Sequence, residues 1–248
     1  HLSIRRQRQM CIRDSYNPDL NIHVFSDTRS TETNAVLDIP VEVRFGNSFG
    51  LLVRGNADLT TYTPTGGTTY NNNLFFLHTA AMLKTSRLYI KGGIRPTWDQ
   101  GKLNVLPDVL IDAHLQERKI ILTAGWSGYV RKNSYMFLVS ENPWINQPLS
   151  QFNTRITELY GGFKGTLSNS FNYRVTTGFT EYLNLPLFTN HVRPGLFEVV
   201  REGKLQALHT QAEMGFVLQD QFNASAKIDI YNFPVSYTHL RAHETVLD

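Results

Sequence analysis

Apolar and polar residues alternate strictly in the stretch LDIPVEVRF at positions 37–45. Every second residue is leucine, isoleucine, valine or phenylalanine, and the residues between them are aspartate, proline, glutamate and arginine. Successive side chains of a β-strand point to opposite faces, so this pattern predicts a strand with one apolar and one polar face. After the short turn GNSFG the alternation returns in LLVRGNADLT. The two segments are therefore expected to pair as an antiparallel hairpin.

The same alternation recurs along most of the chain and predicts about a dozen strands. They are expected at 20–26, 37–45, 51–59, 73–84, 86–95, 107–117, 119–131, 155–165, 170–182, 195–202, 204–218 and 221–233. Short turns such as ERK, EGK and QDQ separate some of them, and longer connections such as TWDQGKLNVLP and LNLPLFTNHVRPG separate others. Short turns at one end and long loops at the other are typical of outer-membrane barrels.

One connection breaks the strand pattern. In NSYMFLVSENPWI, Tyr135, Leu138 and Val139 follow one another at helical spacing. Ser134 is placed to cap the start of a helix, and Pro143 is placed to stop it. The segment therefore predicts one short helix inside a long connection.

Together these patterns predict an all-β fold, an antiparallel up-and-down meander of about 12 strands that forms an incomplete transmembrane β-barrel. No apolar run approaches the roughly 18 residues of a membrane-spanning helix, whereas a barrel strand needs only about nine to eleven. A soluble β-sandwich surface protein would also alternate, but its buried faces would be rich in large aliphatic residues. Here both faces mix glycine, alanine and threonine with leucine, isoleucine and valine, which favours the barrel.

The second half of the chain resembles TonB-dependent receptors of Bacteroidota-type bacteria, best between about 105 and 233. The resemblance rests on a Pro-Asp strand opening, a glycine-rich strand and a helical piece that ends in ENP. The residues that carry it are Pro107, Asp108, Gly125, Gly128, Asn133, Tyr135, Glu141, Asn142 and Pro143. It implies a bacterial outer-membrane β-barrel that takes up a small solute, with a luminal plug and a periplasmic energy-coupling partner. No plug is recognisable in the sequence, so a plugless, porin-like barrel is an alternative.

Polar residues at alternate strand positions are expected to face the lumen, because a barrel interior is polar. The candidates are Lys91, Arg95, Asp108, Asp112, His114, His209, Glu213 and Lys227. The tryptophans Trp98, Trp126 and Trp144 are expected at the membrane interface, in contact with outer-membrane lipid. Trp144, which falls in a loop, is alternatively placed to contact a ligand.

No catalytic, cofactor or metal site is predicted. The sequence has no HExxH pattern and no GxSxG elbow, and GGFKG lacks the ending of a phosphate loop. Asp112 and His114 lie two residues apart on one strand face, a spacing compatible with a metal site or an acid/base pair. A polar lumen face is the favoured interpretation, because a barrel interior requires alternate polar residues. An outer-membrane barrel enzyme remains an alternative, and it would need a serine beside His114 or His209.

Both ends of the sequence resemble translated sequencing-library adaptor. A codon string for RRQRQMCIRD matches one adaptor strand, and VSYTHLRAHE matches the partner adaptor in reverse complement. Residues 1–15 and 235–248 are therefore expected to be foreign, and 16–234 to be a barrel fragment. Five of the 24 basic and three of the 21 acidic residues lie in these ends, so the net charge of +3 falls to +1 without them. Cys11 is lost as well, and nothing then indicates a nucleic-acid partner.

Overall fold

The computed structural model describes residues 15–116, 119–148, 150–168, 170–190, 195–218 and 222–233. The two terminal segments expected to be foreign lie outside these residues, apart from Ser15. The elements are β1 (Ser15–Tyr16), β2 (Asp19–Ser26), β3 (Ser30–Phe45), β4 (Phe49–Pro64), β5 (Tyr70–Asn71), β6 (Leu74–Lys84), β7 (Leu88–Asp99), β8 (Lys102–Gln116), β9 (Ile120–Arg131), α1 (Tyr135–Glu141), β10 (Thr154–Ser168), β11 (Phe171–Asn190), β12 (Phe197–Leu218) and β13 (Phe222–Asn232). Within the described residues, no helix has the length and apolar character needed to cross a membrane.

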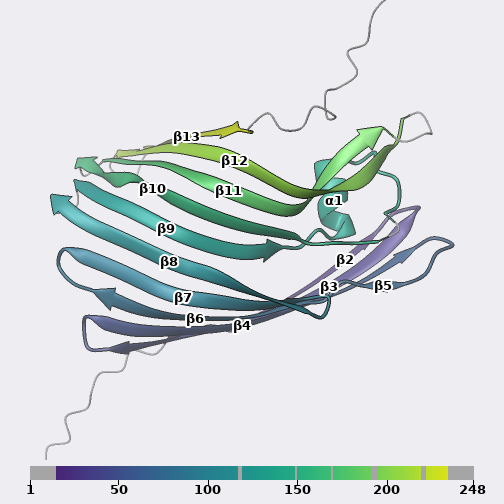
Figure 1. Cartoon of the computed structure of the whole chain (residues 1–248), viewed down its shortest axis with the longest axis horizontal. Coiled ribbons are helices and arrows are strands. Elements are labelled where there is room, and N and C mark those ends of the chain that lie inside the picture. Colours follow the sequence, from purple (N-terminus) through teal and green to yellow (C-terminus); the bar gives the residue numbers. More distant parts are fainter. Residues whose placement is uncertain are drawn as a thin grey trace, which may run out of the picture.

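All thirteen strands belong to one antiparallel sheet whose neighbours follow the order of the chain (Figure 1). β1 and β2 lie one after the other along the same edge of β3, and β5 and β6 do the same along β4. At the other edge β13 pairs with β12. The sheet is strongly curved and, among the described strands, its two edges do not meet. The predicted all-β up-and-down meander of about a dozen strands is confirmed.

Several strands are longer than predicted, because pairing with a neighbour extends segments that look like loops in sequence. The stretch TWDQGKLNVLP was expected to be a long connection, but β7 and β8 are joined by a tight turn at Gln100 and Gly101. Both residues have positive φ, 47° and 80°, as a two-residue hairpin turn requires. The triplet EGK at 202–204 is not a turn, since β12 runs straight through it in register with β11.

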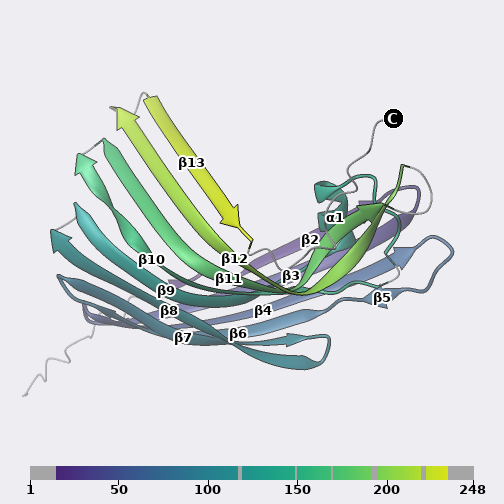
Figure 2. The same ribbon diagram turned by 45° about the horizontal axis from the view of Figure 1, so that its top comes forward.

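The predicted short helix is confirmed as α1. Ser134 is its N-cap, and the Ser134 hydroxyl accepts a hydrogen bond from the backbone N–H of Phe137 at 3.1 Å. The helix ends at Glu141, and the N–H of Asn142 still bonds to the carbonyl of Leu138. Figure 2 shows that α1 lies on the side toward which the sheet curves.

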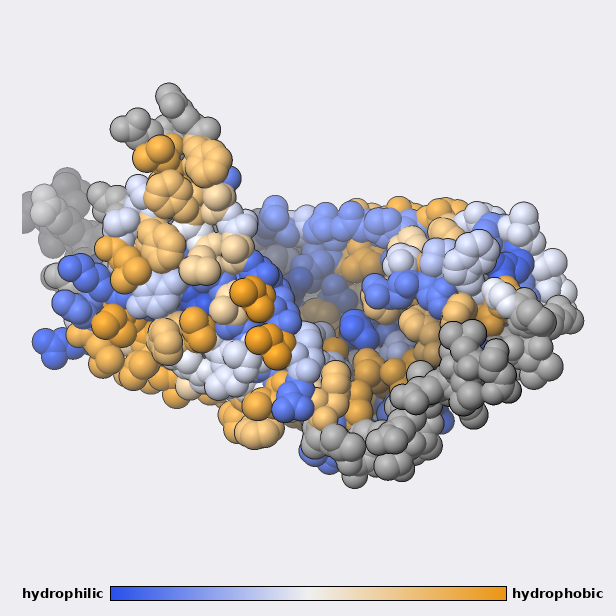
Figure 3. All heavy atoms as spheres, turned by 90° about the horizontal axis from the view of Figure 1, so that it is seen from above, coloured by the Kyte–Doolittle hydropathy of each residue, from blue (hydrophilic) through white to orange (hydrophobic). Residues whose placement is uncertain are grey.

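The two faces of the sheet differ in polarity, as β8 shows. Leu103, Val105 and Leu115 point to the convex face and are 55–64% exposed, whereas Asp108 and Asp112 point to the concave face and are buried. Figure 3 shows hydrophilic residues lining the hollow of the sheet and hydrophobic residues along its outer flank. A β-sandwich would cover such an apolar face with a second sheet, and the described residues supply none, so that alternative does not fit.

Aromatic side chains mark both borders of the apolar outer face. Near the short turns the outer face carries Phe45, Phe49, Phe163, Phe171, Phe216 and Phe222, and toward the other end it carries Phe75, Trp98, Trp126 and Phe179. Along β11 the two rows are separated by the eight residues from Phe171 to Phe179, which is about 26 Å of strand. Barrel strands tilt by about 35–45° from the membrane normal, so this length corresponds to a height of roughly 20 Å, somewhat less than the apolar band of roughly 25 Å on membrane barrels. Trp144 belongs to neither aromatic row, because it lies in the connection after α1, where it is 64% exposed.

Close backbone approach between β10 and β11 depends on Gly178. A Cβ at this position would lie 2.6 Å from Tyr160 Cβ and 2.7 Å from the carbonyl oxygen of Leu159, whereas a Cβ at Gly161 would meet only the Thr123 carbonyl oxygen, at 3.8 Å. We expect Gly178→Val to lower the free energy of unfolding by about 1–3 kcal/mol through overpacking. Gly161→Val is the matched control. Urea unfolding of the folded protein in detergent micelles, followed by tryptophan fluorescence, measures both, and equal midpoints would contradict the prediction.

Candidate functional site

Asp108 is the centre of a buried charge cluster on the concave face. Its Oδ2 atom lies 2.5 Å from Nε2 of His78 and 2.8 Å from Nζ of Lys91. β6, β7 and β8 are neighbours, and their register brings the three residues together from separate strands. The structure therefore pairs two of the sequence candidates, Lys91 and Asp108. It adds His78, which the alternation in LFFLHTAAML places on the same face as Leu74 and Ala80.

Arg95 lies beside this cluster and has a different environment. Its guanidinium donates a hydrogen bond to the carbonyl oxygen of Gly128 at 3.2 Å, and its Nε has no partner among the described residues. Phe76 lies between Arg95 and Arg54, with the two guanidinium carbons 5.6 Å and 5.8 Å from the ring centre. The concave face therefore presents cationic groups stacked on an aromatic ring.

The sequence candidates Asp112 and His114 lie near the short turns, and Asp112 forms an ion pair with a lysine of another strand. Its Oδ2 atom is bound by Nζ of Lys164 on β10, at 2.7 Å. Both sequence candidates line a hollow of about 870 Å³ near the short turns, together with Glu42, Arg44 and other residues. No local sequence pattern indicates the role of Lys164, because its partner Asp112 lies two strands away.

The remaining candidates lie on the concave face of the last three strands. His209 is bonded to Glu158 at 3.4 Å and to Asp229 at 2.9 Å, and its ring stacks on Tyr231 at 4.2 Å. Within the part of the chain that the structure describes, both hydrogen-bond partners of His209 are carboxylates, and neither is the serine that a barrel enzyme would need. Glu213 lies 4.0 Å from Arg174 of β11, and Lys227 lies 3.2 Å from Asp229. Among the described residues, no group of three or more His, Cys, Asp or Glu is arranged to hold a metal ion.

The connection between β9 and β10 is held against the concave face by Glu32, which is 2% exposed. Its carboxylate accepts hydrogen bonds from the N–H groups of Tyr135 at 2.6 Å and Met136 at 3.2 Å, at the start of α1. The side chain of Gln151, farther along the connection, donates to the same carboxylate at 2.9 Å. One buried acid therefore fixes both ends of this connection.

A small apolar cluster of Tyr62, Tyr135, Leu138 and Ile145 fills the space between α1 and the strands. The Tyr135 hydroxyl donates to Asp27 at 2.8 Å. Burial, and then the bond to Asp27, raise the pKa of Tyr135 to about 12. Tyr135 therefore remains a protonated donor at physiological pH.

Amide side chains hold the end of the same connection. Asn153 and Asn72 exchange two hydrogen bonds, at 3.1 Å and 2.8 Å, and Asn153 also donates to Asp99 at 2.6 Å. At its start, Lys132 forms an ion pair with Asp58 at 2.5 Å. The connection from 132 to 153 is thus anchored to β3, β4, β7 and the segment before β6.

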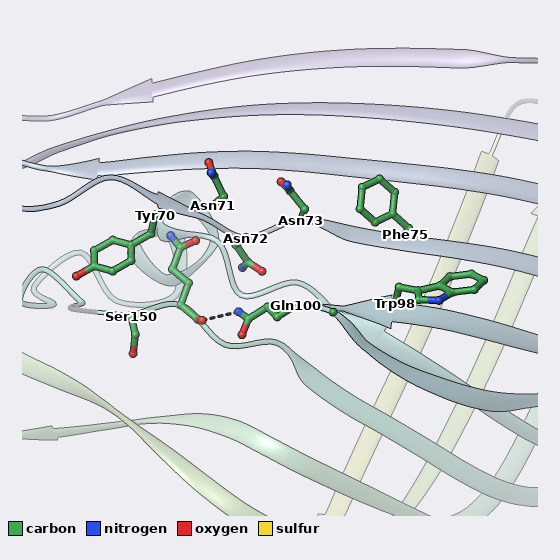
Figure 4. A pocket seen from close by; sticks show the side chains of 10 residues that line it. Tyr70, Asn71, Asn72, Asn73, Phe75, Trp98, Gln100 and Ser150 are labelled. Carbon is green, nitrogen blue, oxygen red and sulfur yellow. Dashed lines mark hydrogen bonds between the residues drawn. The ribbon is translucent and has the colours of Figure 1, made fainter.

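A pocket of about 780 Å³ opens at this rim (Figure 4). It is lined by Tyr70, Asn71, Asn72, Asn73, Phe75, Trp98, Gln100, Gly101, Ser150 and Gln151. The side chain of Gln100 crosses it to donate to the carbonyl oxygen of Gln151 at 2.8 Å. Trp98 is the one sequence candidate among the residues that line this pocket. Trp126 lies farther along the outer face of the sheet, and Trp144 lies in the connection after α1.

In comparisons with known proteins, no family model matches this chain, and no characterised protein matches it in sequence. Several solved structures resemble it in fold. The siderophore receptor PirA of Pseudomonas aeruginosa aligns with a TM-score of 0.58 and 10% identity, over 82% of this chain and 44% of its own. A mutant of the ferric enterobactin receptor PfeA of the same species aligns with a TM-score of 0.53 and 13% identity, over 81% of this chain and 36% of its own. The copper transporter OprC aligns with a TM-score of 0.52 and 13% identity, over 82% of this chain and 37% of its own.

This chain therefore spans less than half of the length of each of these solved chains. Identities this low establish the fold alone, and the three solved structures named above are two receptors and a transporter. The predicted resemblance to TonB-dependent receptors is confirmed at the level of fold. The described residues have the fold of part of the β-barrel wall of such outer-membrane proteins.

We expect Glu32→Ala to loosen the connection between β9 and β10. The substitution leaves the buried N–H groups of Tyr135 and Met136 and the amide of Gln151 without their acceptor, which costs about 1–3 kcal/mol for an unsatisfied buried group. Hydrogen–deuterium exchange at the Tyr135 and Met136 amides should accelerate accordingly. Glu42→Ala is the control, because Glu42 lies on the same strand and forms an ion pair with the exposed Arg44. Unchanged exchange in Glu32→Ala would show that the carboxylate does not anchor the helix.

Proposed function

We propose that this chain is the wall of an outer-membrane β-barrel that takes up a small solute, of the TonB-dependent-receptor type. The observation that carries the proposal is the sidedness of the single sheet. Its convex face is apolar between two aromatic rows, whereas its concave face holds charged residues and the anchored connection 132–153. A sheet of this kind is suited to lipid on one side and water on the other.

The described part is proposed to be a fragment of that barrel, with native residues from about 16 to 234. In lipid every backbone donor and acceptor must be paired, so an open edge cannot persist in the membrane. Further strands of the complete protein would pair with β13 and with the β1–β2 edge. The adaptor-like composition of 1–15 and 235–248 supports the same division.

The polar residues of the concave face are proposed to face the lumen and to bias which solutes pass. Lys91, Arg95, Asp108 and the other candidates act through their charge and by hydrogen bonding to the solute, and no catalysis is involved. The proposed partners are outer-membrane lipid, the solute itself, and a periplasmic energy-coupling protein that contacts another region of the complete protein. The solved relatives in fold are named for siderophores, iron and copper, which are therefore the first solutes to test.

The complete gene, recovered with its flanking sequence and expressed in a Gram-negative host, tests this function. We expect the product in the outer-membrane fraction, with a faster gel mobility before boiling than after it. Uptake of iron-loaded siderophores, copper and neutral sugars is measured with and without a protonophore. Uptake that needs the proton-motive force supports the receptor, and passive uptake supports the porin-like alternative. A product that stays soluble or transports none of the probes refutes the proposal.

Arg95→Gln tests the role of the concave face. Arg95 hydrogen-bonds to a backbone carbonyl, so its loss removes a positive charge from the proposed lumen. In planar bilayers with the complete barrel, the reversal potential in a salt gradient should shift toward cation selectivity. Lys204→Gln is the matched control, because Lys204 pairs with Glu181 on the convex face. Equal shifts in both variants would contradict a lumen-facing Arg95.

A further inference from the structure

The pocket at the rim lies outside the concave trough. Along the segment from β5 to β6, Asn72 and Leu74 point to the concave face and are buried, so Asn71, Asn73 and Phe75 point to the convex side. Phe75 pairs with Trp98, and both are about 40% exposed. The pocket therefore begins at the aromatic border of the apolar outer face and extends up to the turn between β7 and β8 (Figure 4).

The residues that line this pocket are mostly amide and aromatic. Five of its ten lining residues carry a side-chain amide, three are aromatic, and none carries a charge. Amides offer both donors and acceptors, and tyrosine and tryptophan combine a flat apolar surface with a polar group. A pocket of this size lies within the range of small-ligand sites.

Several of these side-chain amides have a donor or acceptor atom that makes no hydrogen bond to the described residues. Asn71 and Asn73 use their Oδ1 atoms to accept from Thr61 and from the backbone of Thr60, so these bonds leave their Nδ2 donors unused. Gln100 uses Nε2, which leaves Oε1.

Gln151 supplies an independent observation. This side chain is only 7% exposed and donates through Nε2 to Glu32, yet its Oε1 has no hydrogen-bond partner among the described residues. A buried acceptor without a partner costs free energy unless a ligand or water completes it. Gln151 also lines the pocket.

We propose that this pocket binds a neutral saccharide unit. A sugar ring presents apolar C–H faces that pack on Trp98 and Phe75, and a rim of hydroxyl groups, each of which donates and accepts. The hydroxyls match the unused groups of Asn71, Asn73 and Gln100. An anionic ligand finds no lysine or arginine in the lining, and a metal ion finds no carboxylate, imidazole or thiolate.

Two sources offer this chemistry. One is a free oligosaccharide outside the cell, and the other is the neutral sugar portion of a glycolipid in the outer leaflet. The second is suggested by the place of Trp98 and Phe75 at the border of the apolar band, where a lipid head group would lie. Binding at this pocket does not depend on solute uptake through the lumen, so this proposal and the proposed function can fail separately.

The complete protein, purified in detergent, is titrated with maltotriose, xylotriose, mannotriose and galactotriose. It is titrated in parallel with a Gram-negative glycolipid in micelles, and with the same glycolipid after its neutral sugars have been removed by hydrolysis. Intrinsic tryptophan fluorescence and calorimetry report the Kd. We expect Trp98→Ala to raise the Kd about tenfold through loss of the stacking surface, and Asn71→Ala to raise it about fivefold through loss of a hydrogen bond.

Trp126→Ala is the matched control, because Trp126 is also about half exposed on the outer face but does not line the pocket. Binding of any trisaccharide that is weakened by Trp98→Ala and kept in Trp126→Ala supports a free-saccharide site. Binding of the intact glycolipid alone, lost with its sugars and weakened by Trp98→Ala but not by Trp126→Ala, supports a head-group site. Glycolipid binding that survives removal of the sugars, equal effects of the two tryptophan substitutions, or no binding of any probe at millimolar concentration would overturn the proposal.

Discussion

Backbone hydrogen bonding between neighbouring antiparallel strands is the constraint on which the rest of this structure depends. The ladder is continuous from the β1–β2 edge to β13, and it keeps all thirteen strands in one curved sheet. Because the ladder fixes which residues lie opposite each other, it also decides which side chains share a face. The apolar convex face, the charged concave face and the aromatic borders all follow from this register.

The connection between β9 and β10 shows how a long loop becomes part of such a wall. It has little regular structure apart from α1, so its position is set by side chains of the strands. Glu32 accepts three hydrogen bonds from it, and Asn72 and Asp58 bind its two ends. The same anchoring brings Gln151 to the rim beside Gln100, so the pocket there exists only because the loop is fixed.

The sequence pattern predicts the faces of the strands well, because alternation with a period of two depends on local sequence alone. It correctly puts Lys91 and Asp108 on strands of one sheet and places α1 with its Ser134 cap. It does not predict the partners. Glu32 and Tyr135 are hydrogen-bonded although they lie 103 positions apart in sequence, and Asn72 and Asn153 lie 81 positions apart. No local pattern encodes contacts at such sequence separations. Strand ends were missed for a related reason, since EGK and TWDQGKLNVLP look like loops until a neighbouring strand pairs with them.

The burial of the Asp108 cluster has a consequence for the electric field along the concave face. Lys91 and Asp108 carry opposite charges, and His78 contacts the same carboxylate, in a site that is largely closed to water, with the side chains of His78, Lys91 and Asp108 5%, 22% and 9% exposed. Dissolved ions screen exposed charges over about 8 Å at physiological ionic strength, but they screen buried pairs much less. The more exposed pairs, such as Arg174 with Glu213, are therefore sensitive to salt, whereas the interactions of the Asp108 cluster are much less so. The electric field along this face thus has one component that follows the ionic strength outside the cell and one that depends on it only weakly.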